Sequence, residues 1–186
     1  MPCMPDLIHD KKGATTVEFA LVGMLFLTAL LFTMVVAEVL YFGQKLDYAT
    51  EQASRNILIG TSQQKQQSNP ANPATLASFT QELCGYLPAA MSCSDVIVNL
   101  YKVPAANPGY YAYVKTDMSG LALPPLTPGS GQFALGSQGD YQYLQVIYPV
   151  TLLPAFMTSW LDTNATYKGK AAYLVISTAA FRVEQF

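Results

Sequence analysis

The feature that most constrains this chain is an uncharged, apolar segment near its N-terminus. Phe19 to Ala37 are nineteen consecutive residues without a charge or a proline. An α-helix rises about 1.5 Å per residue, so this segment is long enough to cross a bilayer core of about 30 Å. We therefore predict one transmembrane helix over about residues 17–42, which would pass through the membrane once.

A carboxylate, Glu18, lies at the start of this apolar helix. Placing an ionised carboxylate in lipid costs about 2.5 to 3.5 kcal/mol on insertion scales, so such a residue is a functional candidate that needs a partner. Cleavage after Gly13 would supply one, because Ala14 would then carry a new α-ammonium four residues before Glu18 on the same helical face. The alternative is that Glu18 reaches the lipid headgroups from an anchor that is never cleaved.

The first thirteen residues are polar and lack an apolar core of their own. In a secretory signal peptide the apolar region precedes the cleavage site and is removed with it, whereas here it follows Gly13 and would remain. We therefore interpret residues 1–13 as a leader. Lys11 and Lys12 favour a cytoplasmic N-terminus by the positive-inside rule, although two nearby aspartates make the bias modest.

These residues resemble the processing signature of type IV prepilins. Gly13 takes the cleavage position, a small apolar residue follows, and Glu18 is the fifth residue of the mature chain. The segment 13–22, GATTVEFALV, resembles the TadE-like minor pilins (pseudopilins) of the tight-adherence (Tad) type IVb pilus system. The closing segment 180–186 is similar to the Arg-Asn-Glu-Pro ending often seen in that family, with two departures.

The resemblance implies that a membrane aspartic prepilin peptidase cleaves between Gly13 and Ala14, that the new terminus is methylated, and that Glu18 contributes to subunit assembly. It implies a role in the assembly or priming of a Tad-type pilus for surface adhesion. The implied partners are the peptidase, other pilins and pseudopilins of the same system, the inner-membrane assembly platform and membrane lipid. The implied location is the bacterial inner membrane, with a periplasmic C-terminal domain, or the extracellular pilus.

The helix is predicted to continue beyond the membrane, from about residue 14 to residue 58. No proline occurs between residues 6 and 69, and Gly60 is a candidate C-cap. Apolar residues recur at three- and four-residue steps, namely Phe42, Leu46, Ala49, Ala53 and Ile57. The following residues, 61–74, are polar and rich in breakers, so they predict a solvent-exposed linker.

Aromatic and charged residues predict where the helix leaves the lipid. Lys45 and Asp47 are charged, and Tyr41, Phe42 and Tyr48 lie where an interfacial aromatic belt is expected. We interpret these rings as interface anchors, with subunit contacts as the alternative role.

Residues 75–186 predict a small periplasmic α+β domain in which a mostly antiparallel sheet packs on helix. Thr75 is a candidate N-cap for a helix over 76–87 with one apolar stripe. Strand patterns follow at 96–101, 111–115, 141–148 and 173–178. The alternation in 141–148 indicates that one face of the sheet is solvated. The interval 117–139 contains several prolines and glycines and predicts a long loop. This loop would either contact neighbouring subunits or be disordered.

Cys84 and Cys93 are the cysteines that would remain after removal of the leader. Nine positions apart, they can close a disulfide in an oxidising compartment, which would contribute on the order of 2 to 3 kcal/mol. Two buried free thiols or a redox pair are the alternatives, because geometry decides pairing.

The chain without its leader lacks the residues that common enzymes use. The one histidine, His9, lies in the leader, so no imidazole remains for a catalytic triad or a common zinc site. The carboxylates are scattered, and the net charge of −2 with no basic patch argues against nucleic acid. The sequon at Asn164 is interpreted as a surface loop. We expect no catalytic residues, no metal and no cofactor.

Two functions therefore remain for the chain. One is that of a minor pilin or pseudopilin that is cleaved and then used in pilus assembly. The alternative is an uncleaved bitopic membrane protein whose periplasmic domain binds a ligand or a partner. The fate of residues 1–13 separates the two, because only the first requires their removal.

Overall fold

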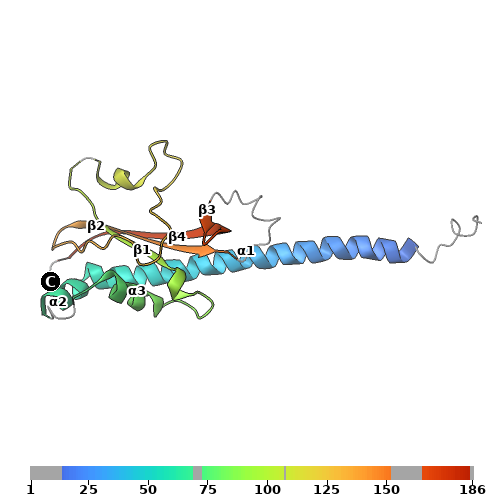
Figure 1. The fold of residues 1–186 in the computed structure, drawn as a ribbon, viewed down its shortest axis with the longest axis horizontal. Coiled ribbons are helices and arrows are strands. Elements are labelled where there is room, and N and C mark those ends of the chain that lie inside the picture. The colour runs from blue at the N-terminus through green and yellow to red at the C-terminus, as the bar shows by residue number, and fades with distance from the viewer. Residues whose placement is uncertain (1–13, 69–72, 107, 152–164, 185–186) are drawn as a thin grey trace, which may run out of the picture. The chain divides into compact units, whose positions relative to one another are not determined.

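The chain forms helices and an antiparallel sheet, which confirms the predicted α+β class. The computed structural model describes residues 14–68, 73–106, 108–151 and 165–184 (Figure 1). The chain divides into two compact units, the first ending at Glu38 and the second beginning at Val39. The described part of the first unit is helical, whereas the second contains the end of that helix, the shorter helices and the sheet.

Helix α1, Ala14–Leu58, confirms the long helix predicted from the apolar pattern. No described side chain between Thr16 and Tyr41 is buried, and Phe19 is 81% exposed. Among the described residues, α1 is the one helix that is long and apolar enough to cross a membrane. Apolar side chains exposed all round a helix indicate that lipid or protein surrounds it in place of water.

The end of α1 is marked by a glycine in the left-handed backbone region, as predicted. Gly60 has φ 79°, and its N–H donates to the carbonyl oxygen of Ile57 at 3.1 Å. A residue without Cβ adopts this conformation at no steric cost, so the helix stops here and the chain turns.

The predicted linker over residues 61–74 is wrong in its first half. Thr61–Ser68 form helix α2, in which Ser62 and Gln63 are buried. Gln63 donates from Nε2 to the carbonyl oxygen of Gly136 at 3.3 Å, which holds the helix in a tertiary contact. Glutamine and lysine are good helix formers, so a polar composition is as compatible with a short helix as with a linker. Residues 69–72 lie outside the described residues.

The second predicted helix is α3, Leu76–Cys84, three residues shorter than the predicted range 76–87. Thr75 caps it as predicted: its Oγ1 accepts from the N–H of Ser78 at 3.2 Å, and Oγ of Ser78 accepts from the N–H of Thr75 at 2.9 Å. Two N–H groups that the first turn would leave without partners are thereby satisfied. The helix ends before Gly85, a residue of low helix propensity.

Four strands form one antiparallel sheet in the order β1-β2-β4-β3. They are β1, Ile97–Lys102; β2, Tyr141–Val150; β3, Ala165–Tyr167; and β4, Lys170–Arg182. Strands β1, β2 and β4 confirm predicted strands, although β4 is much longer than predicted, and β3 is additional. Lys168 and Gly169 join β3 to β4 with φ angles of 49° and 77°, which suit a two-residue hairpin turn.

The predicted strand at 111–115 is wrong. Gly109–Tyr113 form a short 3-10 helix, η2. The ring of Tyr113 lies against those of Tyr101 and Tyr143, with centroid distances of 4.7 and 4.8 Å. Tyrosines favour strands because they pack well on a half-buried surface. Here a helical turn lies against the sheet, and its tyrosine ring packs on the sheet in the same way.

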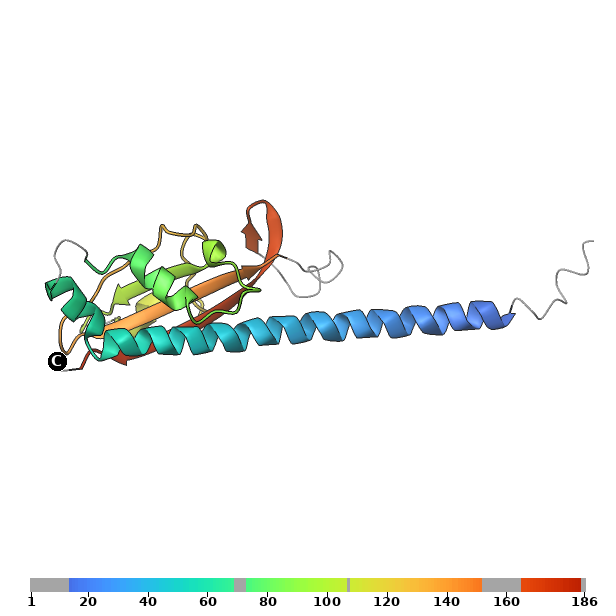
Figure 2. The same ribbon diagram turned by 90° about the horizontal axis from the view of Figure 1, so that it is seen from below.

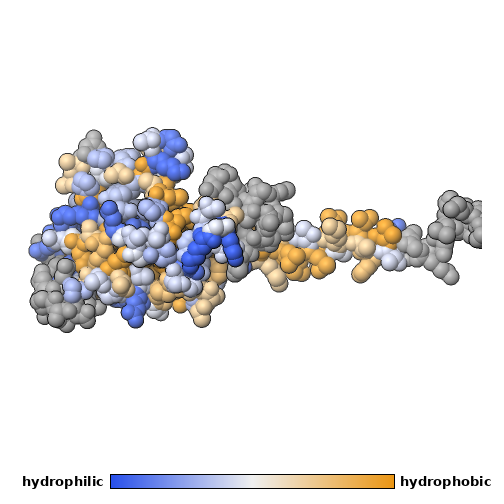
Figure 3. Space-filling model, viewed as in Figure 1, coloured by the Kyte–Doolittle hydropathy of each residue, from blue (hydrophilic) through white to orange (hydrophobic). Residues whose placement is uncertain are grey.

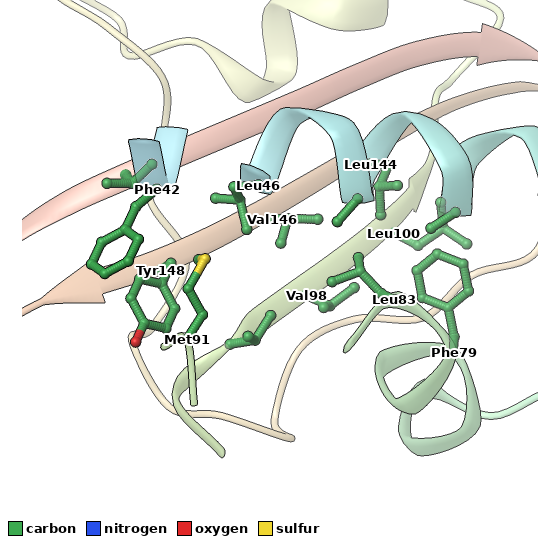
Figure 4. Packing of buried hydrophobic residues seen from close by; sticks show 14 of the residues in the cluster. Phe42, Leu46, Phe79, Leu83, Met91, Val98, Leu100, Leu144, Val146 and Tyr148 are labelled. Carbon is green, nitrogen blue, oxygen red and sulfur yellow. The ribbon is translucent and has the colours of Figure 1, made fainter. Parts of the chain in front are cut away.

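The main core lies between one face of the sheet and the helices α1 and α3 (Figure 2). The apolar stripe predicted on α1 is buried there, from Phe42 to Ile57. Figure 4 shows how side chains from the helices, the sheet and the loop after α3 meet in this core, namely Phe42, Leu46, Phe79, Leu83, Met91, Val98, Leu100, Leu144, Val146 and Tyr148. From Phe42 to Ile57 the sheet and α3 therefore cover one side of α1.

The opposite face of the sheet is also covered, so the predicted solvated face is wrong. Nine of the ten residues of β2 are buried. Ile97 and Ile147 form a second small core with Leu126 packed against it, and the Nε2 of Gln145 donates to the carbonyl oxygen of Ala122 at 3.4 Å. The irregular segment 117–139 confirms the predicted loop, and its fold-back explains why polar residues in β2 are not in water.

A disulfide joins Cys84 to Cys93, whose Cα atoms lie 5.7 Å apart. Cys84 is the last residue of α3, and Cys93 is the first of a short 3-10 helix, η1, Cys93–Asp95, which leads into β1. The bond therefore fixes the connection between a core helix and an edge strand. Of the three states considered for these cysteines, the structure contains the disulfide.

We expect Leu144→Ala to lower the free energy of unfolding by about 2 to 5 kcal/mol, because it leaves a cavity in the main core where Leu144 is fully buried. Denaturant unfolding of the detergent-solubilised chain, followed by tyrosine fluorescence, measures this change. Leu123→Ala is the matched control, since Leu123 is 43% exposed, and it should change stability by less than about 1 kcal/mol. Equal losses in the two variants would contradict this core.

We expect the double variant Cys84→Ala, Cys93→Ala to lose about 2 to 3 kcal/mol of unfolding free energy, because the unfolded chain regains the freedom that the disulfide removes. The same denaturant titration measures it. Cys3→Ala serves as the control, since Cys3 does not belong to this pair. Free thiols at both positions in the protein isolated from its native envelope would contradict the disulfide.

Candidate functional site

The predicted cleavage position adjoins the start of α1. Gly13 lies outside the described residues, and Ala14 is the first residue of the helix. Glu18 follows four residues later, so the helical backbone places the two positions on one face. Their backbones are separated by about 6 Å along the helix axis. An ammonium on Ala14 and the flexible side chain of Glu18 are therefore within reach of each other.

Glu18 is exposed in an apolar setting, beside Val17 and Phe19. Among the described residues no ion pair involves Glu18. The pairs that occur there all belong to the second unit, namely Arg55–Glu51, Lys102–Asp140 and Lys168–Asp95. The part of the chain that the structure describes thus gives Glu18 no counter-ion. A newly formed terminal amine on Ala14 would supply one.

The helix around Glu18 presents an apolar surface to its environment (Figure 3). Its large exposed side chains between Val17 and Leu40 are leucines, valines, phenylalanines and methionines. Gly23 lies on this stretch with no atom near the position that a Cβ would take. A surface of this size and composition is unsuited to water and indicates burial in lipid or against other helices.

The aromatic residues at the end of the apolar stretch divide into two groups. Tyr41 and Tyr48 are exposed, and the Nζ of Lys45 lies 5.7 Å from the centroid of the Tyr41 ring, as suits residues of an interfacial belt. Phe42 is 5% exposed and meets Tyr148 edge-on at 5.8 Å. The predicted belt is therefore wrong for Phe42, because the helix turns this residue toward the core.

A charged cluster next to the disulfide ties η1 to the β3–β4 hairpin. The carboxylate of Asp95 accepts from the hydroxyl of Tyr167 at 2.9 Å and from the Nζ of Lys168 at 2.7 Å. The hydrogen bond from Lys168 lowers the pKa of Asp95, and the hydrogen bond from Tyr167 lowers it to a smaller extent. Partial burial of the carboxylate acts in the opposite direction and raises this pKa. The cluster fastens two segments that are far apart in the sequence, and we assign it a structural role.

A group of tyrosines on the loop-covered face was not identified as a site in the sequence. Tyr101 and Tyr143 lie opposite each other on β1 and β2, and the ring of Tyr113 in η2 stacks on Tyr143 and lies tilted against Tyr101. Burial raises the pKa of all three hydroxyls. The signal in the sequence is the recurrence of tyrosine in three neighbouring segments. These ring contacts fasten η2 to the sheet.

The structure does not bring the predicted site residues together into one place. Ala14 and Glu18 belong to the first unit, whereas Cys84 and Cys93 belong to the second. The two groups therefore serve different purposes: the first concerns the helix and its surroundings, and the second concerns the stability of the folded domain.

Comparison with known families addresses the N-terminal segment. Residues 13–55 match the family model described as TadE-like protein. No curated protein and no solved structure was found to match the chain. The matched range contains Gly13, Glu18 and nearly all of α1, and it ends before α2. Residues 13–55 of this chain are thus similar to TadE-like proteins, which confirms the resemblance carried by its sequence.

Proposed function

We propose that this chain is a minor pilin, or pseudopilin, which a prepilin peptidase processes and which takes part in the assembly or priming of a Tad-type pilus for surface adhesion. The observation that carries the proposal is the TadE-like match over residues 13–55. The geometry adds that Glu18 is exposed on an apolar helix one turn after Ala14.

Cleavage changes the charge of the helix start. Before it, the nitrogen of Ala14 is an uncharged amide; hydrolysis of the bond after Gly13 turns it into an α-ammonium. Two opposite charges 4 Å apart attract by about 4 kcal/mol at an effective dielectric constant of about 20. This is comparable with the cost of about 2.5 to 3.5 kcal/mol for a carboxylate in lipid. Processing therefore provides a counter-ion whose attraction to the Glu18 carboxylate is about as large as that cost.

The same pair sets the alignment of neighbouring helices. In a bundle of subunits, each Glu18 pairs with the ammonium of its own chain or of a neighbour. Sliding one helix by a single turn moves the charges by about 5.4 Å and leaves a carboxylate unpaired in a low-dielectric region. The correct axial register is therefore the one in which every carboxylate has an amine.

The topology we propose places the N-terminus in the cytoplasm and the folded domain in the periplasm. Residues 1–13 are the leader, about 17–42 span the inner membrane, the helix extends to about residue 58, and residues 75–186 are the periplasmic domain. Lys11 and Lys12 support this orientation. The Cys84–Cys93 disulfide supports it independently, since such bonds persist in the periplasm and not in the cytoplasm.

The role proposed is structural and not catalytic. The partners are the prepilin peptidase, other pilins and pseudopilins of the same system, the inner-membrane assembly platform and membrane lipid. The alternative, an uncleaved bitopic protein with a periplasmic binding domain, predicts a different mass. Intact-mass measurement of the protein purified from its native envelope tests this: loss of residues 1–13 supports processing, and their retention overturns it.

We expect Gly13→Ala to slow or block removal of the leader, because the peptidase must fit the residue before the cleaved bond closely. The readout is the ratio of full-length to shortened chain in membranes. Gly23→Ala is the matched control, since it adds the same methyl group to the helix in open space, and it should be processed normally. Normal processing of Gly13→Ala would place the cut elsewhere.

We expect Glu18→Ala to permit cleavage yet impair assembly, because the amine of Ala14 is formed but has no carboxylate to align it. The measurement is the amount of shortened chain together with its recovery in pili or in complexes with other subunits. Glu38→Ala is the control, being a carboxylate of the same helix beyond the uncharged segment. Assembly of Glu18→Ala at the wild-type level would show that the counter-ion account is wrong.

A further inference from the structure

We infer that the outer edge of β4 is a docking edge, to which an extended segment of another pilus subunit, uncharged in its middle and acidic near its ends, adds as a further strand of the sheet. The location of the edge rests on the fold of the second unit alone. The identity of the partner as a pilus subunit rests on the function proposed above.

The strand order leaves one side of β4 without a neighbour over most of its length. β2 pairs with β4 from Tyr173 to Arg182, whereas β3 pairs with it only from Lys170 to Ala172. Within the described ranges, no strand pairs with this outer side beyond Ala172. Burial agrees, because three of thirteen β4 residues are buried against nine of ten in β2.

The hairpin turn determines which backbone groups of β4 face outward. In a two-residue hairpin, the residues that flank the turn form a hydrogen-bonded pair, here Tyr167 with Lys170. Backbone groups of successive residues point to opposite sides of a strand, so the even-numbered residues face β3 and the odd-numbered ones face β2. Beyond β3, the N–H and C=O groups directed away from the sheet are those of Leu174, Ile176, Thr178 and Ala180.

The other edge of the sheet is closed by the chain itself. The N–H of Leu100 in β1 donates to the carbonyl oxygen of Gln132 at 2.8 Å, and its carbonyl accepts from Ala134 at 3.0 Å. Gly131 comes so close that a Cβ there would lie 1.9 Å from the carbonyl oxygen of Val98. A loop and a glycine thus cover the edge of β1. Within the described ranges the outer side of β4 is met only beyond Arg182, where the N–H of Glu184 donates to the carbonyl oxygen of Leu58 at 2.9 Å, and the stretch from Leu174 to Ala180 has no such cover.

The sequence of β4 lacks the devices that keep exposed edges from pairing. Ala171 to Phe181 are eleven residues without a charge or a proline. Natural edge strands usually carry lysine, proline or a bulge where pairing would be harmful. Lys170 and Arg182 flank the uncharged stretch, so a partner strand that is uncharged in its middle and acidic near its ends has the complementary chemistry.

A second copy of this chain fits the edge poorly. Its β1 edge is already covered by residues of the same chain. A second β4 strand, whether parallel or antiparallel, would bring its Lys170 and Arg182 beside those of the first copy, and like charges placed opposite each other in a sheet are destabilising. This favours an extended segment of a different subunit.

The test compares Thr178→Pro with Thr178→Val in the full-length chain expressed in its native host. Proline at this position removes an outward N–H and leaves the β2 ladder intact, as edge strands tolerate, whereas valine keeps the N–H. A photo-crosslinking residue at position 180 should capture a subunit with its own prepilin-type N-terminus, identified by mass spectrometry. Thr178→Pro should lose this product, and Thr178→Val should retain it. The same residue at exposed position 111 is the control and should not capture it.

Two further measurements keep the outcomes distinct. The amides of Leu174, Ile176, Thr178 and Ala180 should exchange with deuterium quickly in the detergent-solubilised chain and slowly in the assembled form. Thr178→Lys, which alters no backbone group, should also lose the crosslink if Thr178→Pro fails to fold. Unchanged capture by these variants, or no gain of protection on assembly, overturns docking at this edge. Retention of residues 1–13 in the wild-type chain overturns the proposed function instead.

Discussion

Helix α1 has to be stable in two different environments along its length, and the rest of the structure depends on that constraint. Up to Tyr41 the described side chains of α1 are exposed and mostly apolar, as lipid or other helices require. From Phe42 to Ile57 one stripe of the same helix is buried by the sheet and α3. Apolar surface left in water costs about 25 cal/mol per Å², so a helix of this kind needs a folded domain wherever the lipid ends.

Covering that stripe leaves the sheet with a second face, and the irregular segment after η2 covers it. This explains polar side chains that would be out of place in a two-layer fold. Gln145 is buried and donates from Nε2 to the carbonyl oxygen of Ala122 at 3.4 Å, and buried Asn99 accepts from the N–H of Gln132 at 3.1 Å. Buried amides need such partners, so the loop is held by the strands that it covers. A substitution that loosens the loop would therefore expose the sheet.

Local signals in the sequence predicted the elements that local physics decides. The three- and four-residue spacing on α1, the Thr75 cap and the positive φ of Gly60 depend on neighbours in the chain. The errors concern contacts distant in sequence. Helix α2 is held by a hydrogen bond from Gln63 to Gly136. The segment at 111–115 does not form a strand, because Tyr113 packs against tyrosines of β1 and β2. The face of the sheet that was predicted to be solvated is covered by a loop, and no periodicity in the sequence indicates that this loop folds back. For the site, Glu18 was singled out by its charge at the start of an apolar helix and by the resemblance, whereas the open edge of β4 emerges only from the strand order.

We assign roles in assembly to Glu18 and to the outer edge of β4, and the two differ in how unfavourable they are in the absence of a partner. A carboxylate in lipid is unfavourable until a positive charge is close to it. In the proposed function, cleavage after Gly13 would supply that charge to Glu18. The N–H and C=O groups along β4 face water, which satisfies them, so an unoccupied edge carries little penalty. A subunit can therefore remain stable in the membrane after processing with its edge open. Removal of the leader would be the step that commits the chain, and strand addition the later step that selects its neighbour.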